Sequence, residues 1–133
     1  MSKRISGINI AVEDLTSATK KYEDFFGVQA SPITEFAFPG LVGTVLDVDG
    51  FKLNLISSPE EDTSVSRFLK KNGEGVFLLS VTVESMNSAI NQLKSAGGKP
   101  LLPSSAEGSF GIVNFVHPKQ MNGVQVELLQ LPD

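Results

Sequence analysis

Hydrophobic and polar residues alternate with a period of two over several short stretches of the chain, which is the pattern of β-strands with one buried face. The first such stretch runs from Arg4 to Val12. Its two faces carry Ile8, Ile10 and Val12 on one side and Gly7, Asn9 and Ala11 on the other. The apolar face predicts a strand that packs against a helix and leaves the opposite face available for a site.

A period of three to four follows directly and predicts an amphipathic helix. Asp14 is a typical N-cap residue, and Gly27 is placed to end the helix in the left-handed conformation. The apolar positions between them are Leu15, Ala18, Tyr22 and Phe25.

Two further strands are predicted between Val42 and Ile56, because their apolar runs flank Asp49-Gly50, a pair that favours a tight hairpin turn. A short helix is predicted over Ser64 to Lys71, where lysines occupy the last turn and Asn72-Gly73 follows as a stop.

The second half of the chain repeats this plan. It predicts a strand over 76–83, a helix from 86 to about 96, and strands near 112–116 and 124–129. A shift of 71 residues pairs Gly7 with Leu78, and a shift of 73 residues pairs Asn54 with Glu127. A duplicated unit is the economical interpretation of this self-similarity.

We therefore predict an α+β fold in which two tandem βαβββ modules form a curved mixed sheet around a central cleft. A single domain spans 1–133, with the first module at about 4–58, a connecting helix at about 64–72 and the second module at about 74–131. Because side chains alternate across strands, the cleft is expected to receive Gly7, Leu78, Asn54 and Glu127.

The amino-acid composition limits which partners and which kinds of metal site the chain can have. Eleven basic against fifteen acidic residues give a net charge of −4, and no basic run is present, so neither nucleic acid nor a membrane is expected as a partner. The chain has no cysteine, which excludes disulfides and thiolate ligands, and a single histidine, His117, which excludes a multi-histidine metal site within one chain. No secretory or membrane-spanning segment is visible, so a cytoplasmic location is expected.

Three segments carry a resemblance to a known family. They are RISGINIAVEDLTSATKKYEDFFGV, SVSRFLKKNGEGVFLLSVTVESMNSAINQLKSAGG and VNFVHPKQMNGVQVELLQ. They resemble the methylmalonyl-CoA epimerase branch of the vicinal oxygen chelate superfamily, which also contains glyoxalase I, extradiol dioxygenases and bleomycin-resistance proteins. The resemblance covers nearly the whole chain and implies the fold predicted above.

The same resemblance implies a degenerate metal site. The family's epimerases hold a divalent metal at positions that fall on Gly7, Asn54, Leu78 and Glu127, of which only Glu127 is a good ligand. The family's catalytic acid would fall near Phe38, and phenylalanine cannot transfer a proton. We therefore expect neither a bound metal nor another cofactor, and no metal-dependent epimerase or glyoxalase activity.

The function expected from these substitutions is binding of a small, partly apolar ligand without metal chemistry. The expected ligand-binding residues are Gly7, Asn9, Phe38, Asn54, Leu78, Ser80 and Phe110. One alternative is a metal-independent isomerase, lyase or cyclase in which Glu127 is the general base, its pKa raised by apolar neighbours, and Asn9, Asn54 or Ser80 stabilise an oxyanion. Another is a non-catalytic partner subunit. A homodimer is expected, since relatives commonly form one.

Two further features have mainly structural interpretations. His117 precedes a proline in a turn where the family does not use it as a ligand, and segment 104–111, rich in small residues, is expected to be a surface loop or a mobile lid carrying Phe110.

Overall fold

The computed structural model of the chain describes residues 3–36 and 40–133. Its elements are β1 (Lys3–Ala11), α1 (Leu15–Phe26), β2 (Thr34–Glu35), β3 (Val42–Val48), β4 (Phe51–Ser57), α2 (Ser64–Asn72), β5 (Gly75–Val83), α3 (Met86–Ser95), β6 (Ala106–Gly108), β7 (Gly111–Val116), the 3-10 helix η1 (Pro118–Gln120) and β8 (Val126–Gln130). Apart from α2 and η1, the order β-α-β-β-β occurs twice, which confirms the α+β class and the two predicted modules.

The chain forms two compact units. The first unit is Gly7–Phe77, and the second unit joins the start of the chain, up to Ser6, to Leu78–Asp133. The strand order is β2-β3-β4-β1 in the first unit and β5-β8-β7-β6 in the second. Each unit combines one parallel pair, β1 with β4 or β5 with β8, with antiparallel neighbours, so both are mixed.

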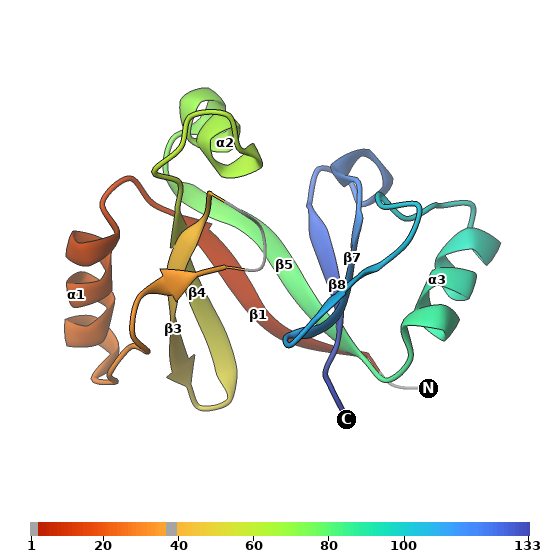
Figure 1. Cartoon of the computed structure of the whole chain (residues 1–133), viewed down its shortest axis with the longest axis horizontal. Coiled ribbons are helices and arrows are strands. Elements are labelled where there is room, and N and C mark those ends of the chain that lie inside the picture. Colours follow the sequence, from red (N-terminus) through yellow and green to blue (C-terminus); the bar gives the residue numbers. More distant parts are fainter. Residues whose placement is uncertain (1–2, 37–39) are drawn as a thin grey trace. The chain divides into compact units, whose positions relative to one another are not determined.

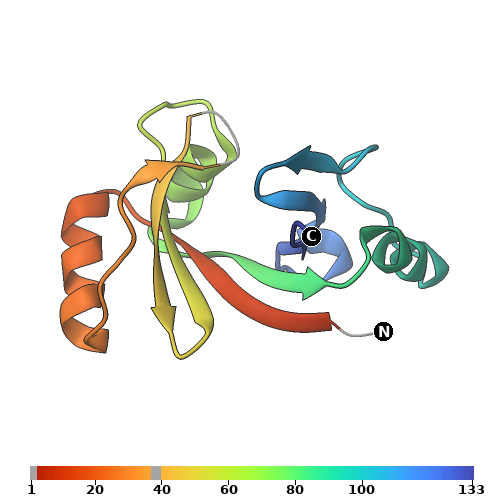
Figure 2. The same ribbon diagram turned by 60° about the horizontal axis from the view of Figure 1, so that its bottom comes forward.

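In the first unit, α1 covers one face of the strands and runs beside β3 and β4 in both views (Figures 1 and 2). The core beneath α1 contains Ile10, Val12, Leu15, Leu46, Leu53 and Leu55. A separate core of Ala11, Leu41, Ile56 and Val65 brings α2 against the strands. Because Ala11 and Ile56 alternate with the residues under α1, this second core covers part of the opposite face.

In the second unit, α3 packs on the strands in the way that α1 does in the first. Its core contains Val83, Met86, Ala89, Val116, Val126 and Leu128. The start of β1 is joined to this unit through Lys3, whose Nζ donates a hydrogen bond to Oε1 of Gln92 on α3. The faces predicted for helix packing are therefore the ones that pack, and the residues at alternate positions are left for other contacts.

Local sequence signals explain where the helices begin and end. Oδ1 of Asp14 accepts a hydrogen bond from the backbone N of Ser17 at 3.0 Å, and Gly27 ends α1 with φ 69°. The turn between β3 and β4 has φ 55° at Asp49 and φ 91° at Gly50, the positive angles that a two-residue hairpin requires. No helix in the described ranges is long and apolar enough to span a membrane.

Two expectations need correction. Segment 104–111 is not simply a loop, because it contains β6, which pairs with β7 through Ala106 and Val113. The sequence signal is weak since the strand has only three residues and a glycine at its end. Phe25 does not belong to the buried face of α1, since it is 81% exposed. With 3.6 residues per turn it lies about 80° around the helix from Leu15, whereas Phe26 lies on the side of Leu15 and is 39% exposed.

Candidate functional site

Two asparagines form a pair in the middle of the first unit, and we call Asn9 and Asn54 the amide pair. They occupy matched positions of the parallel strands β1 and β4. Nδ2 of Asn54 donates to Oδ1 of Asn9 at 2.9 Å and to the backbone oxygen of Ile8 at 3.3 Å. Asn9 is buried and Asn54 is half-buried. The amide pair lies on the face opposite α1, as the alternation in β1 predicted.

The surroundings of the amide pair change along the strands. Two residues towards α2 are Ala11 and Ile56, which belong to the apolar core under that helix. In the opposite direction along β4, Lys52 lies two residues before Asn54, and its Nζ forms an ion pair with Asp47. That contact, together with the backbone N of Gly50, holds the pKa of Asp47 below its usual value. The amide pair thus separates an apolar region from a surface ion pair.

Gly7 lies beside Lys52 in a place that leaves no room for a side chain. A Cβ atom at Gly7 would lie 2.3 Å from the backbone oxygen of Lys52, far inside van der Waals contact. Its register partner on β4 is Lys52 itself. The close approach of two backbones, rather than a positive φ, therefore requires glycine here.

A second polar pair occupies the second unit, and we call Ser80 and Glu127 the acid pair. They are matched positions of the parallel strands β5 and β8, and Oγ of Ser80 donates to Oε1 of Glu127 at 2.7 Å. On the other side of Glu127, the matched position on β7 is Phe115, which is 8% exposed. The carboxyl group therefore lies between a hydroxyl and a buried aromatic residue.

Burial raises the pKa of Glu127 above its ordinary value, and the hydrogen bond from Ser80 opposes this rise. The raised pKa confirms the direction that the sequence predicted. The Ser80 contact was not predicted, and Phe38, one of the expected apolar neighbours, lies outside the described residues. A carboxyl group with a raised pKa keeps its proton to higher pH than an ordinary glutamate and is the stronger base once ionised.

Hydroxyl groups continue beside the acid pair. Oγ1 of Thr82 donates to Oγ of Ser6 at 2.8 Å, and Oγ of Ser6 donates to the backbone oxygen of Ser80 at 3.3 Å. The sequence pattern did not single out Ser6. Ser6 is three positions from Asn9, so alternation places the two residues on opposite faces of β1. Ser6 lies in the part of β1 that belongs to the second unit.

The other predicted residues have separate positions. Leu78 is buried at 4% exposure and brings apolar surface to the second unit. Phe110 is half-buried in the turn between β6 and β7, and its ring packs on Gly108. His117 is exposed and caps η1, since its Nδ1 accepts a hydrogen bond from the backbone N of Lys119 at 3.1 Å.

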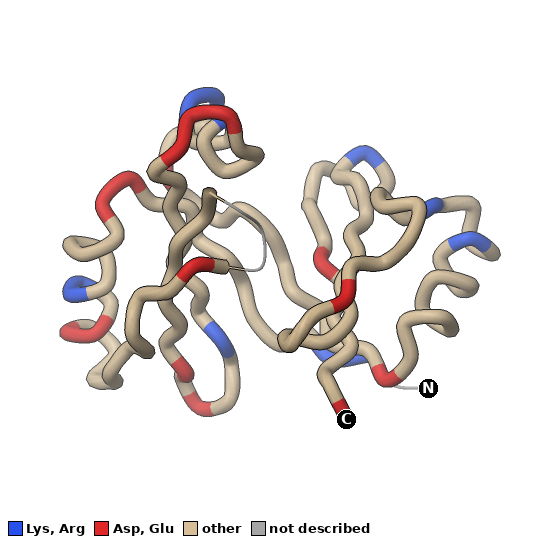
Figure 3. Tube along the Cα trace, in the orientation of Figure 1, with Lys and Arg blue, Asp and Glu red and all other residues tan. Residues whose placement is uncertain are grey.

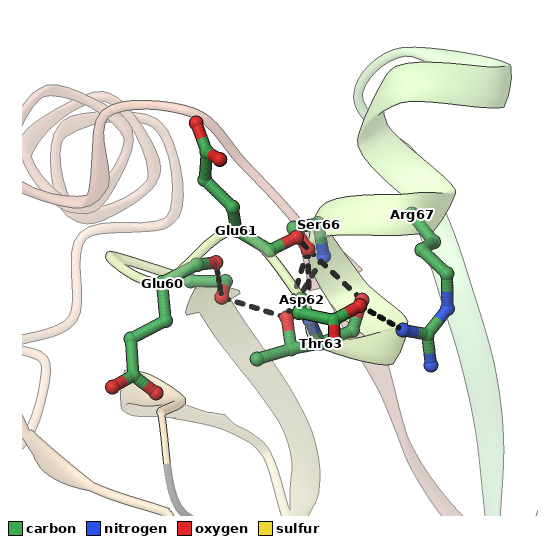
Figure 4. Close-up of polar contacts among 7 residues, drawn as sticks. Glu60, Glu61, Asp62, Thr63, Ser66 and Arg67 are labelled. Carbon is green, nitrogen blue, oxygen red and sulfur yellow. Dashed lines mark hydrogen bonds and ion pairs between the residues drawn. The ribbon is translucent and has the colours of Figure 1, made fainter.

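A hollow of about 190 Å³ lies at the start of α2, apart from the amide pair. Figure 4 shows the polar contacts among Glu60, Glu61, Asp62, Thr63, Ser66 and Arg67 at this end of the helix. It is lined by Glu13, Ser58, Pro59, Glu60, Glu61, Ser66, Leu69 and Lys70. Acidic residues precede the helix and basic residues follow along it (Figure 3). Its hydroxyls are already bonded: Ser58 donates to the backbone oxygen of Glu60 at 2.6 Å, and Ser66 forms a capping box with Thr63. These contacts hold the loop and cap the helix.

Among residues 3–36 and 40–133, no three histidine, aspartate or glutamate side chains form a group that could hold a metal ion. Of the four positions that the sequence comparison assigned to metal ligands, Gly7 and Asn54 lie in the first unit, and Leu78 and Glu127 lie in the second.

Comparison with known proteins agrees with the fold. Residues 4–128 match the family model described as Glyoxalase/Bleomycin resistance protein/Dioxygenase superfamily. Mitochondrial methylmalonyl-CoA epimerase of Mus musculus is 30% identical over 129 residues, covering 96% of this chain and 72% of that protein. Ethylmalonyl-CoA/methylmalonyl-CoA epimerase of Cereibacter sphaeroides is 30% identical over 136 residues, covering 98% and 100% respectively.

Solved structures give the same relationship. A variant of Streptomyces coelicolor methylmalonyl-CoA epimerase in complex with 2-nitronate-propionyl-CoA has a TM-score of 0.87 and 27% identity, with 98% of each chain covered. Methylmalonyl-CoA epimerase from Mycobacterium tuberculosis has a TM-score of 0.88 and 27% identity, covering 96% of this chain and 87% of that one.

Proposed function

Since the chain belongs to the Glyoxalase/Bleomycin resistance protein/Dioxygenase superfamily and is related to methylmalonyl-CoA epimerase, we propose that it binds a small, partly apolar ligand without a divalent metal. The observation that carries this proposal is the lack of room for a side chain at Gly7. The resemblance places a metal ligand at this position, but the backbone oxygen of Lys52 lies only 2.3 Å from where the first side-chain atom would be. The position therefore offers no side chain, and a single substitution would not restore one.

The remaining donors do not fit a divalent metal ion either. Leu78 has no ligand atom, and the amide nitrogen of Asn54 is engaged by Asn9 and Ile8, which leaves one neutral oxygen. Glu127 is the one anionic donor of the four, and its Oε1 accepts from Ser80. Two protein oxygens of this kind are fewer than zinc, magnesium or calcium sites built by proteins normally use.

The ligand class follows from the surfaces and from the relatives. Replacing ligand and acid side chains by Gly7, Leu78 and Phe38 exchanges charge for apolar surface, which favours an apolar group. Solved relatives are complexes with 2-nitronate-propionyl-CoA and with methylmalonyl-CoA. We propose a short acyl thioester as the ligand, with the amide pair of the first unit among the residues that bind it. The binding roles expected for Leu78, Ser80 and Phe110 stay predictions.

A second candidate function is favoured by Glu127. Its burial raises its pKa, so the ionised carboxylate is a stronger base than an ordinary glutamate. In a metal-independent isomerase, lyase or cyclase, this carboxylate would take a proton from the carbon beside the carbonyl and return it to the product. Glu127→Gln would then abolish turnover and leave ligand binding in place, whereas a pure binding protein shows no turnover in either form.

Elemental analysis of the purified protein, together with thermal melts in excess Co²⁺, Mn²⁺, Zn²⁺ or EDTA, tests the metal-free proposal. We expect less than stoichiometric metal and equal melting temperatures under all four conditions, because a ligand that does not bind the native state does not stabilise it. Glu127→Gln is the matched control, since it removes the one anionic donor. Stoichiometric metal, or stabilisation by metal that Glu127→Gln loses, would overturn the proposal. The homodimer stays a prediction, and light scattering that gives the mass of a monomer would contradict it.

A further inference from the structure

The side chain of Asn9 has an unusual combination of burial and unused hydrogen-bonding capacity. Asn9 is 7% exposed, yet no acceptor for its Nδ2 is found in the described part of the chain, while its Oδ1 accepts from Asn54. Every fully enclosed side-chain nitrogen or oxygen among the described residues has a partner. The Nδ2 group of Asn9 is therefore not fully enclosed, although the rest of the side chain is buried. A ligand that covers this group has to supply an acceptor for it, because buried amides normally have their donors satisfied.

The orientation of both amides is fixed by one backbone atom. The side chain of Asn54 contacts the carbonyl oxygen of Ile8, which can only accept a hydrogen bond. The atom of Asn54 that faces Ile8 must be nitrogen, and the same nitrogen contacts Asn9 at 2.9 Å. The facing atom of Asn9 must then be oxygen, so its NH₂ group points away from the pair. This settles the choice between the two amide orientations, which are otherwise easily confused.

We propose that Nδ2 of Asn9 donates a hydrogen bond to the carbonyl oxygen of the bound acyl group, and that Asn54 is a positioning residue that aims this donor. The inference rests on the proposed ligand binding and names the group of the ligand that the first unit recognises. An NH₂ group only donates, so its partner is an acceptor, and a ligand without one would leave a buried donor unpaired.

The neighbouring charges favour an uncharged carbonyl over a carboxylate. Lys52, the nearest cation along β4, is already paired with Asp47. On the other side of the amide pair, Ala11 and Ile56 belong to an apolar core. Val45, the partner of Asn54 on β3, is half-buried and also apolar. A thioester carbonyl with a short alkyl chain satisfies this donor without bringing an unpaired charge to an apolar region.

The test compares two probes that differ in the carbonyl oxygen, propionyl-CoA and the thioether S-propyl-CoA, with free CoA as the reference. Calorimetry should show that the wild-type chain binds propionyl-CoA about 3- to 10-fold more tightly than S-propyl-CoA, the range expected for one neutral hydrogen bond. Asn9→Asp keeps an acceptor for Asn54 and removes the donor, so the ratio should fall to about 1. Asn54→Leu should also lower the ratio, because Asn9 is then free to rotate, and free CoA should bind it as it binds the wild type.

Asn91→Asp is the matched control, because it makes the same chemical change at an exposed position of α3 and should leave the ratio unchanged. Should Asn9→Asp fail to fold, Asn9→Ser replaces it. The shorter side chain cannot reach the ligand as a donor, so the ratio of the two affinities should again fall to about 1. An unchanged ratio in the Asn9 variant, with both probes still bound, overturns this inference alone. Binding of none of the three probes by the wild-type chain overturns the proposed acyl-thioester function, and this inference with it.

Discussion

The amide pair and the acid pair occupy the same place in the two halves of the repeat. The shift of 71 residues that aligns β1 with β5 places Asn9 on Ser80, and the shift of 73 that aligns β4 with β8 places Asn54 on Glu127. In each unit the two residues are matched positions of a parallel strand pair and are joined by a side-chain hydrogen bond, 2.9 Å in the first and 2.7 Å in the second. One backbone arrangement therefore carries two different chemistries.

The two pairs differ in whether their side chains can gain or lose a proton. Neither asparagine titrates, so the amide pair presents the same donor at every pH at which the chain is folded. Glu127 does titrate, and its burial raises its pKa. The same arrangement of strands therefore holds a pair that does not titrate in one unit and a pair that contains a titratable carboxyl group in the other.

The largest effects should come from exchanging side-chain volume at the first pair of repeat positions, Gly7 and Leu78. Gly7→Ala should lower the free energy of unfolding by about 2–3 kcal/mol, since its Cβ would overlap the backbone oxygen of Lys52. Leu78→Ala should lower it by about 2–4 kcal/mol through loss of buried apolar surface and a residual cavity. Urea denaturation measures both. A neutral Gly7→Ala would contradict the steric reason given for glycine.

Breaking the amide pair should cost less. Asn54→Leu removes the donor that satisfies Oδ1 of Asn9 and the backbone oxygen of Ile8, and leaving a buried acceptor unpaired costs about 1–3 kcal/mol. The same denaturation measurement applies, with Asn91→Leu on the exposed surface of α3 as a control that should stay close to the wild type. A loss equal to that of the control would mean that the amide pair is not formed in solution.

Removing the carboxyl group should change the pH dependence of stability. The folded-state pKa of Glu127 is raised, so the folded chain binds the proton more tightly than the unfolded chain. The associated stability is fully present below the unfolded pKa and is lost as pH rises through the folded one. Glu127→Gln keeps a group that can bond Ser80 and should remove this loss, so thermal melts should show a higher melting temperature than the wild type at pH 7 and the same one at pH 3.

The converse substitution sharpens the comparison. Asn54→Asp places an acid in the first unit at the position that corresponds to Glu127, and it should make stability fall with rising pH where the wild-type first unit contributes no such fall. Equal pH profiles for Asn54→Asp and the wild type would show that the two positions differ in environment as well as in residue type.

The smallest effect should come from Ser80→Ala. Its hydroxyl donates to Glu127 and lowers the pKa of that carboxyl, so its removal should raise the pKa further and lower stability by about 0.5–1.5 kcal/mol. A carbon-detected NMR titration of the Glu127 carboxyl follows the pKa directly. A pKa that falls in Ser80→Ala would contradict the assigned hydrogen bond.

Features set by local chemistry could be predicted from the sequence. Asp14 caps α1, Gly27 ends it, and Asp49-Gly50 makes the hairpin turn, because each depends on the conformational preferences of one or two residues. β6 was missed because three residues carry too short a pattern. The exposure of Phe25 was missed because two adjacent phenylalanines end α1 and the spacing did not show that Phe26 is the less exposed of the two.

The strand faces on which the candidate residues lie could be predicted from the sequence, but the contacts of these residues could not. Alternation placed Asn9 and Ser80 on the faces away from the helices, yet the partners Asn54 and Glu127 depend on the register of parallel strands that are distant in sequence. The close approach at Gly7 depends on the path of the β4 backbone, which no local pattern encodes.

Calorimetric titration of propionyl-CoA into chelator-treated, dialysed protein, before and after addition of Co²⁺, tests metal-free ligand binding most directly. Because Gly7 and Leu78 supply no ligand atoms, the dissociation constant should be the same in both titrations. Binding that is absent from the chelated protein and returns with Co²⁺ would contradict the central claim.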